Sequence, residues 1–268
     1  VGYIMEVDID YPDHLHHLHS DLLFLVENKV PPMLGSKFPK LLATLEHKRN
    51  YVIHYVALKQ ALKHGLALKN THKAIRFKQR PYLKGFIDLN ARLRQEAKGN
   101  DFQENLLKLC SNACYGKFLE NPLKRRQIVL ATHQKQIMKY ISKAEFLDRK
   151  IFDEELIAIE LHRKRIKFDR PVIVGFSILD LSKVHMYGFH YDVMLKRYPI
   201  DVLNLCYTDT DSYVYKIKTI NVHRDMLKNI EVFDTSNFPK YHHCFSEKNY
   251  KVMGTLKDET GGIPINAF

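Results

Sequence analysis

Two short segments in the last third of the chain have the hydrophobic patterns of β-strands. Residues 202–207 form an apolar run, and residues 212–218 alternate, with Tyr213, Tyr215 and Ile217 on one face. Runs of this length and alternation are typical of strands. The residues between them are turn formers, so the pattern predicts a β-hairpin with Asp209 and Asp211 at its tip.

A second pattern, about ninety residues upstream, has helical period. Apolar residues recur at i, i+3, i+4, i+7 and i+8 and predict a buried face: Leu106, Leu109, Cys110, Ala113 and Cys114. Polar side chains share another stripe: Lys108, Ser111, Asn112 and Tyr115. Glycine is common at helix ends, so we expect the helix to end at Gly116.

The remaining pattern mixes strands and helices. It predicts strands at 3–9, 74–78, 126–131 and 156–162, and helices at 41–67 and 178–195.

Both the predicted hairpin tip and the predicted helix carry side chains that could bind a ligand or take part in catalysis. Two carboxylates one residue apart repel each other unless a cation neutralises them, so Asp209 and Asp211 favour a divalent-metal site. The alternative is that this sequence forms only a solvated turn. On the predicted helix, Lys108 can meet phosphate, Tyr115 can stack on a base or sugar, and Gly116 lets another group approach the backbone. An amphipathic helix with no ligand is the plainer alternative.

Taken together, these segments resemble a known family. The run from Tyr207 to Ser212, Tyr-Thr-Asp-Thr-Asp-Ser, resembles the C motif of family B DNA polymerases, and the run from Lys108 to Gly116, with Asn112 and Tyr115, resembles their B motif. Further segments are similar to the protein-primed organellar and viral type, and the likeness to polymerases of Maverick/Polinton-type mobile elements is the strongest. These segments lie at 2–8, 77–84, 233–237 and 254–259.

The resemblance implies an α+β fold of the right-hand polymerase type: a palm of antiparallel sheet with helices, and fingers formed by a helical hairpin. The implied division is palm at 1–40, fingers at 41–118, and palm again at 119–268 with a short insertion and most of the thumb missing.

The resemblance also implies roles for individual residues. Asp211 would be shared by two Mg²⁺ ions and Asp209 would support it, so both are the expected catalytic and metal-binding residues. The expected nucleotide-binding residues are Lys108, Asn112, Tyr115 and Lys98, and the expected DNA-binding residues are Gly116 and Lys117. The implied partners are a DNA primer-template, dNTPs and a terminal priming protein.

The chain departs from the family pattern in two places. The A motif, which supplies another metal-binding aspartate, is expected just upstream of Val1, and Asp8 and Asp10 are not interpreted as its substitutes. The Lys-x-Tyr motif is expected after Phe268. Lys248-Asn249-Tyr250 matches this motif in residue types but lies too early in the sequence. We therefore expect an internal fragment, and a decayed polymerase that binds nucleic acid without catalysis is the alternative.

A reverse transcriptase or RNA-dependent polymerase is a less favoured alternative, because Thr210 separates the two aspartates. The formal net charge of +12 suits a nucleic-acid partner. Four cysteines without Cys-x-x-Cys spacing favour reduced thiols.

Four histidines lie close together near the N-terminus: His14, His16, His17 and His19. They favour a turn and helix start over a zinc site, since no second ligand cluster accompanies them. No apolar run was expected to approach the roughly 20 residues of a membrane span. The expected location is intracellular, and the nucleus for a mobile element of a eukaryote.

Overall fold

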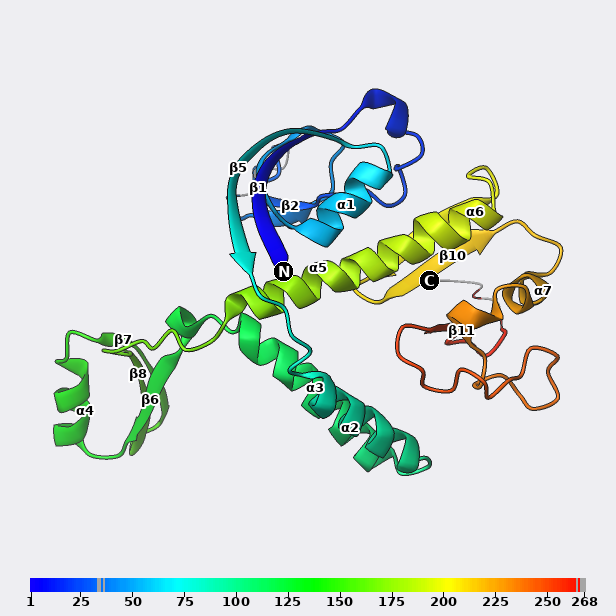
Figure 1. Cartoon of the computed structure of the whole chain (residues 1–268). Coiled ribbons are helices and arrows are strands. Elements are labelled where there is room, and N and C mark those ends of the chain that lie inside the picture. Colours follow the sequence, from blue (N-terminus) through cyan, green and yellow to red (C-terminus); the bar gives the residue numbers. More distant parts are fainter. Residues whose placement is uncertain (33–34, 36, 264, 266–268) are drawn as a thin grey trace. The chain divides into compact units, whose positions relative to one another are not determined.

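A computed structural model describes residues 1–32, 35, 37–263 and 265. The chain divides into two compact units, one made of residues 1–111 and 176–268 and the other of residues 112–175 (Figure 1). Both units combine antiparallel sheets with helices, as the α+β prediction requires.

The first unit is built on a three-stranded antiparallel sheet in the order β4-β1-β5. Strand β1 (Gly2–Asp10) lies in the middle, between β4 (Lys48–His54) and β5 (Ala67–Phe77). Ile4 pairs with His54 on one side and with Ile75 on the other. The strand predicted at 3–9 is therefore confirmed, and the strand predicted at 74–78 is the end of the longer β5.

The helix predicted over 41–67 is wrong in its first half. Residues 40–42 form strand β3 (Lys40–Leu42), which pairs with β2 (Glu27–Lys29), and residues 48–54 form β4. Only α1 (Tyr55–Lys63) is helical. The aromatic and β-branched run Tyr51, Val52 and Ile53 gains backbone pairing with β1 and buries Ile53, which outweighs a weak helical period.

An apolar core joins this sheet to the helices. It includes side chains from β1, from the segment after it, from α1 and from the π-helical turn η3 (Phe189–Met194): Val7, Ile9, Tyr11, Leu22, Phe24, Leu58, Ala61 and Tyr191. A three-residue 3-10 turn, η1 (Asp13–Leu15), lies in the predicted histidine-rich turn.

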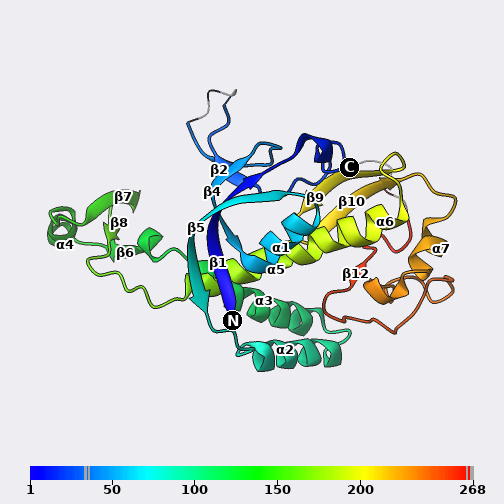
Figure 2. The ribbon, with the colours of Figure 1, turned by 45° about the horizontal axis from the view of Figure 1, so that its top comes forward.

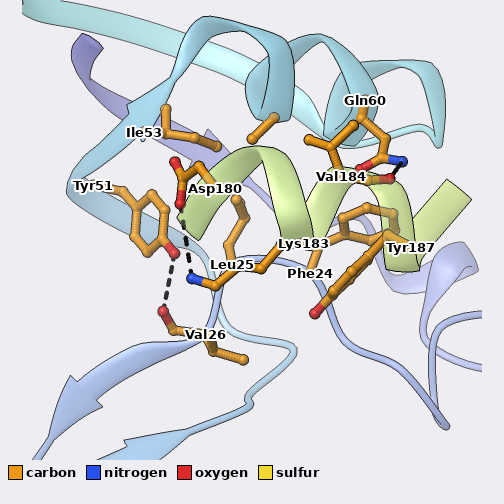
Figure 3. Close-up of a pocket in the computed structure, with 11 residues that line it drawn as sticks. Phe24, Leu25, Val26, Tyr51, Ile53, Gln60, Asp180, Lys183, Val184 and Tyr187 are labelled. Atoms are coloured by element: carbon orange, nitrogen blue, oxygen red, sulfur yellow. Dashed lines mark hydrogen bonds and ion pairs between the residues drawn. The ribbon is translucent and has the colours of Figure 1, made fainter. Parts of the chain in front are cut away.

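Helix α5 (Val172–Gly188) continues through a π-helical turn η3 (Phe189–Met194) into α6 (Leu195–Arg197), which corresponds to the helix predicted at 178–195. Figure 3 shows the part of α5 that belongs to the first unit, with the Gln60 side chain directed toward Val184. Asp180 Oδ2 accepts a hydrogen bond from the His54 backbone N–H at 2.9 Å, and Gln60 donates to the Val184 carbonyl at 2.8 Å. A small cavity of about 40 Å³ lies beside these contacts, and Asp180, Gln60 and Val184 are among the residues that line it.

The same helical stretch changes one expectation. Val172–Arg197, 26 residues with a mean hydropathy of 1.2, is long and apolar enough to cross a membrane by length and composition. The expectation that no run approaches this length is therefore wrong. Core helices pass the same test, so the finding is weak evidence for a span.

Helices α2 (Lys84–Glu96) and α3 (Asp101–Leu119) follow each other with a short connection that turns at Gly99, where φ is +88° (Figure 2). Helix α3 does not end at Gly116 as predicted but continues to Leu119. The predicted buried face is also wrong, because Leu106 and Leu109 are 45% and 62% exposed. None of the side chains of α3 is fully buried, so periodicity indicated a helix here but not which face is covered.

The second unit contains a three-stranded antiparallel sheet in the order β6-β8-β7. Strands β6 (Arg126–Ala131) and β8 (Leu156–His162) match the two predicted runs, and β7 (Phe146–Asp153) was not predicted. Helix α4 (Gln134–Ile141) packs on this sheet over a small core of Ala131, Ile159 and Leu161. A 3-10 turn, η2 (Pro122–Lys124), leads into β6.

The C-terminal part of the first unit begins with the predicted hairpin, β9 (Leu203–Asp209) and β10 (Ser212–Ile217). Short elements follow: α7 (Val222–Leu227), η4 (Ile230–Val232), β11 (Phe233–Asp234) and β12 (Leu256–Lys257). Strands β11 and β12 pair in parallel.

Candidate active site

The hairpin tip brings Asp209 and Asp211 together. Ser212 pairs with Asp209, so Thr210 and Asp211 form a two-residue turn. The Thr210 hydroxyl donates to Asp209 Oδ1 at 3.0 Å, and the Ser212 hydroxyl donates to the Asp209 carbonyl at 3.1 Å. Both carboxylates are exposed to solvent.

Thr210 adopts an unusual backbone conformation, with φ at +48°. The left-handed region is unfavourable for a β-branched residue and is more common for glycine. Such a conformation persists only where the surroundings impose it, and strained residues of this kind cluster at functional sites. Here the tight turn imposes it, and the turn places the two carboxylates one residue apart at the tip.

Side chains beneath the hairpin hold it in place. On β10, the hydroxyl of Tyr215 lies 2.9 Å from Nδ1 of His190, and the Tyr213 ring stacks on Phe189 at 6.4 Å between centroids. Burial lowers the pKa of His190 to about 4, so this imidazole is neutral at pH 7. The predicted common face of Tyr213, Tyr215 and Ile217 is thus the face that packs on the helical stretch after α5.

Asp21 also supports the hairpin, and the sequence pattern did not indicate this role. Its Oδ2 accepts a hydrogen bond from the Leu205 backbone N–H at 2.8 Å, on strand β9. It lies more than 180 residues from its partner in sequence, so only the tertiary structure reveals the contact.

The donor chemistry at the hairpin tip fits Mg²⁺. This ion takes oxygen ligands, keeps several waters, and is commonly bound through one or two carboxylates together with substrate phosphates. Asp209 and Asp211 supply two carboxylates with solvent access on an exposed tip.

The other predicted residues lie on α3. Lys108 is exposed and belongs to the first unit, whereas Asn112, Tyr115, Gly116 and Lys117 belong to the second. The helix places Lys108, Asn112 and Tyr115 on one stripe, at i, i+4 and i+7.

Gly116 has no packing role among the described residues. A Cβ added there would meet no atom within 4 Å, and the residue lies inside the helix, not at its end. Glycine within a helix costs about 1 kcal/mol relative to alanine. Internal packing therefore does not explain the glycine, which leaves room for an external group.

Lys117 and Lys98 already have protein partners. Lys117 Nζ lies 3.1 Å from Glu120, whose carboxylate also pairs with Arg125 and Arg170, and these contacts hold the pKa of Glu120 well below its usual range. Lys98 Nζ lies 3.7 Å from Glu247 Oε1 and 4.9 Å from the centre of the Tyr250 ring.

Asp8 and Asp10 face cationic partners on the first sheet. Hydrogen bonds from His72 and from the Asn50 backbone N–H lower the pKa of Asp8 to about 2. Asp10 pairs with Arg49 at 2.9 Å and with Lys69 at 3.2 Å. That neither replaces the A-motif aspartate stays a prediction.

The segment Lys248-Asn249-Tyr250 also has structural contacts. The Asn249 side chain donates to the carbonyls of Ile230 and Phe233, at 2.7 and 2.8 Å. They involve only the middle residue of the segment, so the coincidental resemblance to a Lys-x-Tyr motif stays a prediction.

A family model described as DNA polymerase type B, organellar and viral, matches residues 14–193. The match includes α3 with its B-motif residues and ends before the β9–β10 hairpin. Comparison with curated proteins and with solved structures found no match. The matched family implies DNA synthesis from a DNA template-primer and nucleotides, with a general requirement for divalent metal. Because the match covers well over half of the sequence, the chain belongs to the organellar and viral type B DNA polymerases.

Proposed function

We propose that this chain carries part of the active site of a protein-primed DNA polymerase, which joins a dNTP to a primer 3′-hydroxyl by two-metal nucleotidyl transfer. The observation that carries the proposal is the strained turn that exposes Asp209 and Asp211 together at the tip of a supported hairpin. We favour a mobile element as the source of this polymerase.

In this proposal Asp211 binds both Mg²⁺ ions and Asp209 supports the site from the end of β9. Bound there, Mg²⁺ would make the primer hydroxyl a better nucleophile and neutralise charge on the triphosphate. Before substrate arrives, the Thr210 hydroxyl already holds the Asp209 carboxylate, and the Ser212 hydroxyl bonds to the Asp209 carbonyl. A further carboxylate from the expected A motif would complete the ligand set.

Helix α3 would contribute the nucleotide contacts. Lys108 would pair with the triphosphate, Asn112 would orient it, and Tyr115 would pack against the sugar and the nascent base pair. Gly116 would let the template or the nucleotide approach the helix backbone, and Lys117 would contact DNA phosphate. For Lys98 to reach the triphosphate, it would have to leave Glu247 and Tyr250.

Primer extension tests this proposal. We expect Mg²⁺-dependent extension by a polypeptide that carries this chain together with the expected A motif and Lys-x-Tyr segment, and loss of at least a thousandfold in rate on Asp211→Asn. Asp201→Asn is the matched control, since Asp201 is an exposed aspartate that precedes β9 and lies outside the turn.

The outcomes separate the alternatives. Retained DNA binding with no extension in the unchanged protein would favour the decayed, binding-only polymerase. Extension that survives Asp211→Asn would contradict the proposed metal site.

A further inference from the structure

The last segment of the first unit has a small apolar core. From residue 221 to residue 263 its regular elements are α7, η4 and the two-residue strands β11 and β12. Its buried core consists of Met226, Phe238 and Cys244, with Phe233 and Phe245 packed against them. Segments with so small a core commonly depend on a metal or a disulfide for stability.

Three histidines meet in this segment. His223 comes from the start of α7, and His242 and His243 come from a turn 19 residues later. One potential ligand atom from each lies within 4.8 Å of the other two. The His223 ring lies 4.8 Å from that of His242 and 5.9 Å from that of His243, between centroids, at steep angles to both.

We propose that His223, His242 and His243 bind a single transition-metal ion of the zinc class, which joins α7 to the turn that carries the other two. Three imidazoles with no carboxylate favour Zn²⁺ and related ions over Mg²⁺ or Ca²⁺. Zinc sites with three protein ligands keep a fourth position for water or another ligand. His243 is exposed, so that position has access to solvent.

The geometry needs only a small adjustment. Zn–N bonds of about 2.0–2.1 Å in a tetrahedron place ligand nitrogens roughly 3.3 Å apart. The described atoms lie within 4.8 Å, so the rings must close by about an ångström or two, which side-chain rotation can supply. Phe238 packs against His242 at 4.7 Å and edge-on to His223 at 5.6 Å, and so forms an apolar wall on one side.

The hydrogen bonding of His242 affects how this ring can bind a metal. One local hydrogen bond opposes binding, because the Cys244 backbone N–H donates to Nδ1 of His242 at 3.2 Å. Coordination through Nδ1 displaces this bond directly, and coordination through Nε2 displaces it by moving the ring hydrogen to Nδ1.

Packing of aromatic rings is the competing explanation for the group. His242 and His243 stack at 4.5 Å, and a purely apolar role would need no metal. Cys244 is not required as a ligand, since its buried Sγ–H donates to the His223 carbonyl at 3.4 Å. The site shares no residue with the proposed polymerase site, so Zn²⁺ binding and primer extension test the two proposals separately.

Zinc titration of the chelator-treated full chain tests the proposal. We expect one Zn²⁺ to bind per chain by calorimetry, a rise in the midpoint of thermal unfolding, and a Co²⁺ visible spectrum typical of a four-coordinate site with three nitrogen ligands. Mg²⁺ should produce none of these. His243→Ala removes an exposed ligand and should weaken Zn²⁺ binding at least tenfold, since even second-shell changes cost 10–100-fold at zinc sites.

His17→Ala is the matched control, because His17 is exposed and lies in the other histidine-rich segment. This variant should bind Zn²⁺ as the unchanged chain does. Equal Zn²⁺ affinity in the unchanged chain and His243→Ala would overturn the proposal, as would the absence of 1:1 binding. Loss of binding in His17→Ala alone would place the ion at the N-terminal histidines and would also overturn it.

Discussion

Thr210 shows how one residue can be placed against its own preference. Its φ of +48° lies where a β-branched side chain is strained, and its hydroxyl bonds to Asp209 at 3.0 Å. Strain of this kind costs on the order of 1–3 kcal/mol. The hairpin, with its support from Tyr215 and Asp21, offsets that cost.

Relief of this strain should be measurable as stability. We expect Thr210→Gly to raise the free energy of unfolding by up to about 1 kcal/mol, because glycine adopts positive φ without steric strain and this relief exceeds its larger entropic cost of folding. Thr208→Gly, at an exposed position within β9, should instead lower it by roughly 0.5–1 kcal/mol. Urea unfolding of both variants tests this, and equal losses would show that Thr210 is not strained.

Buried histidines should make the fold sensitive to acid. The pKa of His190 is lowered to about 4, below the value of about 6.5 for an unfolded chain. Its neutral form therefore stabilises the fold fully above pH 6.5, and this stabilisation is lost as the pH falls toward 4. The groups around it are Tyr215, Tyr213 and Asp21, and Asp21 opposes the shift.

We expect the free energy of unfolding to fall between pH 6.5 and 4 by up to about 1.4 kcal/mol per pH unit for each such histidine. His19, whose pKa burial also lowers to about 4, should add a similar slope. His190→Gln should reduce the slope, whereas His17→Gln, at an exposed position, should leave it unchanged. An unchanged slope in His190→Gln would mean that His190 does not titrate differently in the two states.

At the scale of elements, the helix pair α2–α3 is tied to the C-terminal segment by charged contacts. Lys251 Nζ lies 2.7 Å from Glu104 Oε2, with both side chains about one-fifth exposed, and the hydrogen bond from Lys251 lowers the pKa of Glu104. Lys98 adds its contact with Glu247. These contacts join residues near 100 to residues near 250, whereas the two helices have few buried side chains of their own.

Loss of the contact between Lys251 and Glu104 should make local opening of the two helices more frequent. We expect Glu104→Gln to increase amide hydrogen exchange across α2 and residues 101–111, with little change in the β4-β1-β5 sheet. Glu96→Gln is the matched control, since Glu96 and Arg92 form an exposed pair at 3.8 Å that should contribute little. Similar exchange in both variants would mean that the Lys251 contact does not hold the helices.

At the scale of the whole molecule, positive charge is the dominant property. The formal net charge is +12, and the family to which the chain belongs acts on DNA. Phosphate contacts release counterions, so DNA affinity should fall linearly with salt on a double-logarithmic plot.

We expect this salt dependence for single-stranded and duplex DNA, measured by fluorescence anisotropy between about 50 and 200 mM salt. Asp211→Asn should keep the slope and bind DNA at least as tightly, because it removes a negative charge. Affinity that does not change with salt would contradict a phosphate-based mode of binding.

The sequence by itself determined the features that depend on near neighbours. The β9–β10 hairpin, the acidic turn, the strand β1 and the helical nature of α3 all follow from periods and turn residues within a few positions. The two polymerase motifs are of this local kind, which is why the family could be predicted and was then confirmed.

The tertiary structure decided whatever depends on distant partners. Residues 48–54 became a strand because β1 lies beside them, and Leu106 and Leu109 stayed exposed because no described segment buries that face of α3. Asp21 reached Leu205, and His223 reached His242 and His243, across intervals that carry no periodic signal. The physical reason is that periodicity records which residues share a face, whereas the partner of that face is set by long-range packing.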